Sequence, residues 1–190
     1  MHSTGICMEI GETLYVTKRE AWRKWLSKNY EKKKEVWLIY YKKSSEKKRI
    51  PYGDAVEEAL CFGWIDSTAK RINEEKYAQR FTPRRKGSQL SEINRERVKK
   101  LIKEGKMTEA GLKAISLTKR ELVIAPDVMK RLKEDREVWN NFARFPESYQ
   151  RVRIAYIESQ RKHNNQAFEK SLNNFIKLTK KNKRFGSWKG

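Results

Sequence analysis

The segment Val36-Trp37-Leu38-Ile39-Tyr40-Tyr41 decides the fold, because it is an unbroken run of aliphatic and aromatic residues. Runs of this kind are typical of a buried strand in the middle of a sheet. Residues 12–16 before it predict a short strand. Between the two strands, large apolar residues recur at the spacing of one helical face: Trp22, Trp25 and Leu26.

Helix starts and turns are also marked in this half of the chain. Thr17 and Glu20 predict a capping box at the start of the first helix. Lys42 to Arg49 is a polar, basic loop, and Asp54 predicts the N-cap of a second helix that ends at Gly63. Two strands are then expected, over 64–72 and 77–83, joined as a hairpin by a turn made of Asn73, Glu74 and Glu75.

Everything after Ser88 has helical spacing. Thr108 predicts a helix N-cap, Pro126 and Pro146 suit first turns, and apolar residues from 168 to 176 predict the last helix. The expected fold class is therefore α+β, with a small N-terminal α/β unit and a β-hairpin followed by an all-helical C-terminal part. We expect an α/β unit over 10–88, a helical part over 89–180 and a flexible basic tail over 181–190. Alternatively, the helices of 91–120 pack back on the sheet.

Charge is the most unusual property of this chain of 190 residues. Lys and Arg number 45 against 24 Asp and Glu, giving a net charge of +21. Such an excess favours polyanionic partners such as nucleic acid, although a highly charged, solubilising surface would have the same composition.

The expected compartment is the cytoplasm. Only Cys7 and Cys61 are present, which gives no disulfide framework. We expect no signal peptide at residues 1–11, and no membrane span, because no apolar stretch approaches the ~20 residues that a spanning helix needs.

Three segments that follow one another along the chain resemble the YdeI/OmpD-associated family, also called bacteriocin-protection proteins. The most specific is residues 55–66 (AVEEALCFGWID), followed by 77–85 (YAQRFTPRR) and 93–98 (INRERV). Residues 146–159 are similar to the C-terminal helical domain of that family. The resemblance implies a role in protection or stress, and it brings no catalytic residues with it.

The hairpin after Gly63 is the predicted ligand-binding surface. Its candidate residues are aromatic, acidic, amide and basic: Trp64, Asp66, Tyr77, Gln79, Arg80, Phe81, Arg84, Arg85 and Ser88. Rings beside guanidinium groups can stack bases and hold phosphates, or can hold a small anion. The structural alternative is that Trp64 and Phe81 belong to the core and that Arg80 pairs with Asp66 across the strands.

The loop from Thr82 to Ser88 adds a second anion-binding pattern. Pro83 and Gly87 bracket three cations just before a helix, where backbone N–H groups favour phosphate or sulfate. The alternative is a solvated basic loop. The spacing of a P-loop is absent.

Catalytic and metal sites are not indicated. Cys61 lies in an apolar helix far in sequence from both His2 and His163, so we expect a buried structural thiol. Asp54, Glu57 and Glu58 share a helix face and are expected to be solvated. No zinc spacing and no Ser-His-Asp arrangement is found, and no cofactor is predicted.

Three functions remain open. The first is a cytoplasmic stress or protection protein that binds an anionic partner, with nucleic acid as a candidate. The second is an enzyme or sensor for a small anionic ligand, with a pocket between the hairpin and the helical part, Asp66 as acid or base and Arg80 as the anion clamp. The third is a protein-interaction adaptor that uses exposed Trp37 or Trp139. The sequence fixes no oligomeric state.

Overall fold

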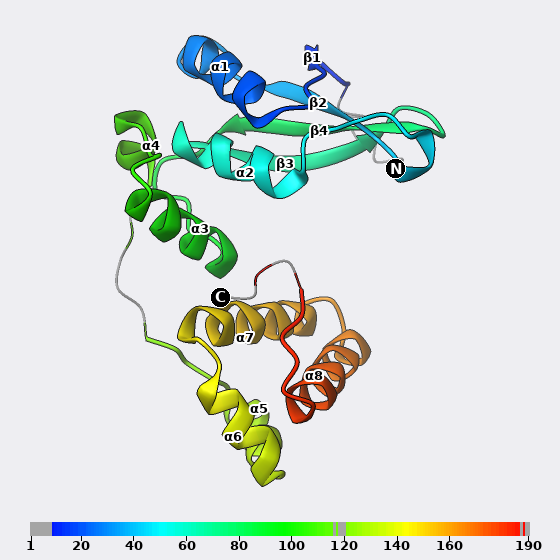
Figure 1. The fold of residues 1–190 in the computed structure, drawn as a ribbon, viewed down its shortest axis with the longest axis vertical. Helices are drawn as coiled ribbons and strands as arrows, with labels where there is room; N and C mark the ends of the chain where they lie inside the picture. Colours follow the sequence, from blue (N-terminus) through cyan, green and yellow to red (C-terminus); the bar gives the residue numbers. More distant parts are fainter. Residues whose placement is uncertain (1–8, 116, 118–120, 187, 189–190) are drawn as a thin grey trace, which may run out of the picture. The chain divides into compact units, whose positions relative to one another are not determined.

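The computed structural model describes residues 9–115, 117, 121–186 and 188, and the predicted α+β class is confirmed (Figure 1). The strands are β1 Thr13–Leu14, β2 Val36–Tyr41, β3 Trp64–Arg71 and β4 Lys76–Pro83. The helices are α1 Arg19–Asn29, η1 Lys43–Ser45, α2 Tyr52–Cys61, α3 Glu92–Lys103, α4 Glu109–Ala114, α5 Pro126–Lys133, α6 Arg136–Arg144, α7 Glu147–Arg161 and α8 Asn165–Lys180.

The chain divides into two compact units. One comprises Met1–Gln89 with Arg97–Leu117, and the other comprises Leu90–Glu96 with Thr118–Gly190. The division therefore falls inside α3, whereas the sequence placed its boundary at 88/89. Residues 97–117 group with the sheet, as in the alternative in which these helices pack back on it. None of the described helices combines the length and apolar composition needed to cross a bilayer.

Strand β2 is the inner strand that its composition predicts. The sheet order is β1-β2-β4-β3, with β1 parallel to β2 and the other neighbours antiparallel. Five of the six residues of β2 are buried. A run that is apolar on both faces fits this position, because side chains of an inner strand alternate between two covered surfaces.

The helices α1 and α2 cover one face of the sheet. Trp22 of α1 is fully buried, its ring centre lies 5.5 Å from that of Phe81 on β4, and its indole N–H donates to the carbonyl of Ala55 at 3.0 Å. The other face carries a smaller cluster of Trp37, Ile39 and Ala78. Hydrophobic residues make up only 37% of the chain. The burial of large aromatic rings compensates for this low content.

Charged side chains fasten α1 to α2. The carboxylate of Glu58 is only 2% exposed, and it accepts from Arg23 at 2.7 Å and from the guanidinium of Arg19. Arg19 also reaches Glu57 at 3.1 Å. Removing Glu58 would take the carboxylate partner from Arg23 and leave Arg19 with Glu57 and Asp54 only, which makes this network costly to break.

Helix ends follow the sequence signals only in part. The predicted capping box is wrong: α1 begins after Lys18, which makes no side-chain cap bond. Asp54 lies in the first turn of α2, whose N-cap position is Pro51. Thr108 is confirmed as an N-cap, since its hydroxyl accepts from Gly111 N–H at 3.2 Å. Pro126 is confirmed at the first turn of α5.

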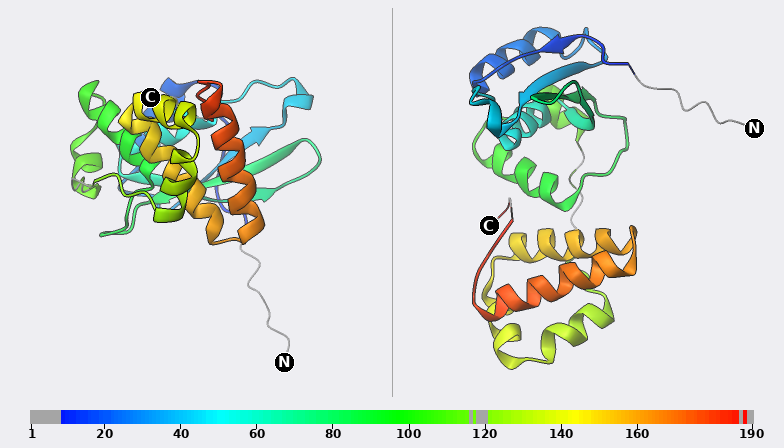
Figure 2. Two further views of the ribbon diagram at one scale, coloured as in Figure 1. Left: turned by 90° about the horizontal axis from the view of Figure 1, so that it is seen from below. Right: turned by 90° about the vertical axis from the view of Figure 1, so that its right-hand side faces the viewer.

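The second unit is built from α5 to α8, with α7 and α8 packed side by side (Figure 2). Its core contains rings at helical spacing, among them Phe142, Tyr149, Phe168 and Phe175. Part of the expected tail belongs to this unit, because Phe185 packs against the core and its N–H donates to the Tyr149 hydroxyl at 3.1 Å. Residues 187, 189 and 190 of that tail lie outside the described residues.

Two glycines test the packing of α4 against α2. A Cβ at Gly111 would lie 2.2 Å from the carbonyl oxygen of Cys61, whereas a Cβ at Gly53 meets nothing within 4 Å. We expect Gly111→Ala to lower the free energy of unfolding by about 1–3 kcal/mol, the usual cost of overpacking. Gly53 lies on α2 and has open space where the new Cβ would be. Gly53→Ala should therefore leave the free energy of unfolding unchanged or raise it by up to ~1 kcal/mol. Urea unfolding of both variants checks this, and equal stabilities would contradict the packing.

Candidate functional site

The predicted hairpin is present as β3 and β4, and its turn is confirmed. The side-chain oxygen of Asn73 accepts from the N–H groups of Glu75 and Lys76, each at 3.0 Å. The register of β3 against β4 shifts at a bulge between Asp66 and Ala69. Gln79 is buried opposite this bulge and donates to the carbonyl of Ser67 at 3.0 Å.

The aromatic candidates of the hairpin are used by the fold. Trp64 is 1% exposed and Phe81 is fully buried, as the structural alternative expected. The indole N–H of Trp64 donates to the carbonyl of Tyr30 at 3.1 Å. Tyr77 stacks on Tyr40 with ring centres 5.4 Å apart. Trp64 and Phe81 therefore offer little surface to a ligand, while Tyr77 is only partly buried.

Asp66 and Arg80 lie on opposite faces of the sheet. Asp66 pairs in register with Phe81, on the face that α1 and α2 cover, and it accepts from the hydroxyl of Tyr52. Arg80 is the next residue along β4, so its side chain takes the other face. There its guanidinium binds Glu35 at 2.8 Å, which holds the pKa of that carboxyl below its usual range. The predicted pairing of Arg80 with Asp66 is therefore wrong.

The basic loop after β4 is partly closed on itself. Arg84 donates to the carbonyl and to the hydroxyl of Ser88, both at 2.9 Å, and burial lowers its pKa. Its Nε is buried and has no hydrogen-bond partner among the described residues. Arg85 is exposed and forms no ion pair among the residues that the structure describes. Arg84 and Ser88 are thus brought together, while the other predicted residues do not converge with them.

A different surface of the first unit gathers cations around tyrosine rings. We name it the basic-aromatic surface, and it consists of Tyr15, Tyr41, Lys42, Lys43, Lys47, Lys48, Arg49 and Lys76. After β2 the chain continues through η1, which ends at Glu46 in the left-handed region with a φ of 56°. The Tyr15 hydroxyl donates to the carbonyl of Lys48, and Arg49 donates to that of Tyr41 at 2.9 Å. Hydrogen bonds from side chains to backbone carbonyls therefore hold this loop beside the end of β2.

The geometry of this surface leaves its charges unneutralised. The ring centres of Tyr15 and Tyr41 lie 5.3 Å apart, and the ammonium groups of Lys47 and Lys76 lie 4.6 Å and 5.8 Å from the centre of the Tyr41 ring. Within the described ranges, none of its cations forms an ion pair with a carboxylate. The nearest acids in the sequence are Glu46 and Glu75, both exposed.

The sequence pattern of Lys42 to Arg49 predicts only a polar, basic loop. The available signal was the run of five cations from Lys42 to Arg49 with one acid, next to tyrosines at the ends of two paired strands. What the sequence did not reveal is that Tyr15 and Tyr41 meet, which depends on the parallel pairing of β1 with β2.

Metal binding and thiol chemistry find little support in this unit. No group of three or more His, Cys, Asp or Glu among the described residues could hold a metal ion. The face of Asp54, Glu57 and Glu58, expected to be solvated, instead binds Arg19. Cys61 is fully buried, as expected, and Cys7 lies outside the described residues.

By fold, the chain is an α+β protein in which a small sheet unit continues into a unit of helices. Residues 14–114 match the family model described as "Domain of unknown function (DUF8412)", so more than half of the chain is covered and the protein belongs to that family. Residues 121–182 match the model described as "Bacteriocin-protection, YdeI or OmpD-Associated", which confirms the predicted resemblance. Comparison with curated proteins and with solved structures found no match.

The segments that resemble the YdeI/OmpD-associated family fall into two different family matches. The segments 55–66, 77–85 and 93–98 lie inside the region of unknown function, whereas 146–159 lies inside the YdeI/OmpD-associated region. Neither description assigns a ligand or a reaction.

The environment of Cys61 predicts a slow thiol. Burial raises its pKa to about 11, and the negative charge of Glu58 adds to this effect while Arg23 opposes it. Because only the thiolate is nucleophilic, we expect the folded Cys7→Ser variant to resist iodoacetamide at neutral pH and to react once unfolded in urea. Mass spectrometry of the alkylated protein measures this. Rapid alkylation of the folded variant would show an activated cysteine instead.

Proposed function

We propose that the first unit binds a polyanion, and specifically single-stranded nucleic acid, through the basic-aromatic surface. The observation that carries this proposal is that Lys47 and Lys76 lie over the ring of Tyr41, next to the ring of Tyr15, which is 46% exposed. None of the six cations of this surface forms an ion pair among the residues that the structure describes. Lysines can follow a phosphate backbone, and an exposed ring gives a base a surface on which to stack.

The aromatic rings beside these cations support a specific surface over a merely solubilising charge. Lys24, Lys28 and Arg85 of the same unit are exposed as well, but within the described residues none of them lies over an aromatic ring. Other cations of the unit have acidic partners. Arg19, Arg23 and Arg80 are all neutralised by carboxylates. Lys33 likewise binds Glu12 at 2.5 Å. Charge that served solubility alone would not need to collect beside aromatic rings.

The residues on which the adaptor hypothesis and the small-anion enzyme or sensor hypothesis depend are not placed as those functions need. Trp37 is fully buried, and Trp139 lies half-buried with the ammonium of Lys133 5.0 Å from its ring, so neither provides the exposed anchor of an adaptor. Asp66 and Arg80, the acid and clamp of the expected small-anion site, lie on opposite faces of the sheet.

A cytoplasmic location and a protective role complete the proposal. The location is supported by the cysteine content, because a chain with only two cysteines is not expected to have a disulfide framework. The role is supported by the printed description of the family matched at 121–182, which names bacteriocin protection. Binding of single-stranded nucleic acid is one way in which a basic protein could serve such a role.

Charge reversal at two exposed lysines tests the phosphate contacts. We expect Lys47→Glu with Lys48→Glu to weaken binding of a fluorescent oligothymidylate. The salt dependence of log Kobs should flatten by about 1.4, at about 0.7 for each single-strand phosphate contact that is lost. Fluorescence anisotropy over a salt series measures both effects.

The matched control reverses Lys24 and Lys28, which are exposed, lie on α1 and are not part of the basic-aromatic surface. It changes the net charge equally and should retain most of the binding. Arg84→Glu with Arg85→Glu tests the loop that the sequence predicted. Equal losses in all three double variants would mean that net charge alone governs binding, and the proposed surface would be rejected.

The Tyr15 ring should contribute by stacking. We expect Tyr15→Ala to cost about 1–3 kcal/mol of binding free energy, the usual contribution of one stacked base. Tyr15→Phe keeps the ring and removes only the hydroxyl that bonds to Lys48, so it should bind nearly as well as the original protein. Anisotropy titrations at one salt concentration compare the two, and equal affinities would exclude stacking at this position.

A further inference from the structure

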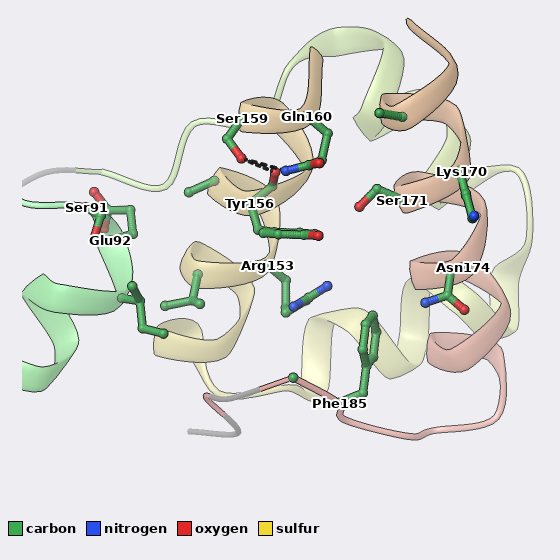
Figure 3. A pocket seen from close by; sticks show the side chains of 15 residues that line it. Ser91, Glu92, Arg153, Tyr156, Ser159, Gln160, Lys170, Ser171, Asn174 and Phe185 are labelled. Carbon is green, nitrogen blue, oxygen red and sulfur yellow. Dashed lines mark hydrogen bonds between the residues drawn. The ribbon is translucent and has the colours of Figure 1, made fainter. Parts of the chain in front are cut away.

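The second unit contains a pocket of about 730 Å³ between α7 and α8 (Figure 3). This volume lies within the range of small-molecule sites, about 300–1,000 Å³. Phe185 and Gly186 line it as well, and so do residues 91–93 of the same unit. The pocket is therefore large enough for a metabolite-sized ligand.

Helical periodicity places the lining side chains. Val152, Tyr156 and Ser159 follow one another at i, i+4 and i+7 along α7, and Ala167, Ser171 and Asn174 do the same along α8. Both helices thus present a mixed face of small, apolar and polar residues to the pocket, while their larger apolar side chains, such as Ile157 and Leu172, fill the core.

Arg153 is the residue that gives the pocket a chemistry. It lines the pocket although it is only 8% exposed, and its buried Nε has no hydrogen-bond partner within the described part of the chain. Its guanidinium carbon lies 4.1 Å from the ring centre of Phe185 and 4.9 Å from that of Tyr156. No carboxylate of the described residues forms an ion pair with it.

A buried cation without an anion is energetically unfavourable, and burial lowers the pKa of Arg153. Two aromatic rings compensate for part of the lost hydration, but rings do not accept the in-plane hydrogen bonds that a guanidinium donates. Buried charges in proteins are normally paired, so an unpaired one at a pocket wall indicates a missing partner.

The polar residues around Arg153 are suited to an anion. Lys170 adds a second cation without an ion pair among the described residues, and Ser171 and Asn174 add hydrogen-bond donors on the same helix face. In Figure 3, Tyr156, Arg153, Lys170, Ser171 and Asn174 are arranged around one space. Glu92, which also lines the pocket, is within 3.7 Å of Arg95 and so has a cationic neighbour of its own.

We propose that this pocket binds a small amphipathic oxyanion, with a carboxylate or phosphate head on Arg153 and Lys170 and an apolar body against Phe185, Val152 and Ala155. A planar carboxylate can accept two parallel hydrogen bonds from a guanidinium, and a phosphate can do the same. The apolar lining excludes a purely hydrophilic ion as the preferred ligand. The site is independent of the basic-aromatic surface, because it uses none of the same residues.

Thermal shift and calorimetry on the full chain test the pocket with defined probes. Benzoate and phenyl phosphate carry the two head groups on the same ring, benzyl alcohol is their neutral counterpart, and inorganic phosphate is the head without a body. We expect one or both aromatic anions to raise Tm and to give a saturable isotherm, because a ligand that binds only the folded state stabilises it. The preferred head group distinguishes a carboxylate from a phosphate ligand.

Two variants connect binding to the named residues. Arg153→Met should abolish saturable binding and yet melt no lower than the original protein, because it removes a desolvated charge and keeps the packing volume. Lys170→Glu, at an exposed position, should weaken binding at least about tenfold, the factor that the loss of one charged hydrogen bond corresponds to. Arg151→Met and Lys177→Glu make the same changes on the same helices outside the pocket and should bind normally.

The proposal is overturned by any of three results. These are equal stabilisation by benzyl alcohol and benzoate, unchanged binding by Lys170→Glu, and no saturable binding of either aromatic anion at millimolar concentration. Should Arg153→Met fail to fold, Lys170→Glu decides the matter alone. The Lys47→Glu, Lys48→Glu variant should bind the small anions normally, so failure of the nucleic-acid proposal and failure of this one remain distinguishable.

Discussion

The pairing of β2 with β1 on one side and β4 on the other is the constraint on which the first unit depends. Because β2 alternates its side chains between two covered faces, it anchors both the aromatic core under α1 and α2 and the smaller cluster around Trp37. The same pairing brings Tyr15 beside Tyr41 and so assembles the basic-aromatic surface. Structure and proposed function in this unit therefore rest on one strand register.

Strong periodic signals in the sequence predicted the elements well. The apolar run at 36–41, the hairpin over 64–83 and the helix N-cap at Thr108 all follow from local chemistry that the tertiary fold did not override. Capping of α1 failed because Thr17 lies one residue before the position that the chain uses. A capping motif depends on interactions within a single helical turn, so a shift of the helix start by one residue is enough to break it.

The candidate site was less predictable because it depends on which face of a strand a side chain takes. Asp66 and Arg80 are both polar and lie near each other along the hairpin, but the register sets Asp66 opposite Phe81 and so separates them across the sheet. The pocket of the second unit was missed for a different reason. Arg153 resembles any other surface cation in the sequence, and only its burial without a partner distinguishes it.

The position of Phe185 has a consequence for comparing members of the YdeI/OmpD-associated family. The family match ends at residue 182, while Phe185 covers the guanidinium of Arg153 and closes one side of the pocket. One wall of the cavity is thus encoded outside the shared region. Proteins that share this helical domain but differ in the few residues after it would keep the same helices. The residues after the shared region would then set the size of the ligand that the pocket accepts.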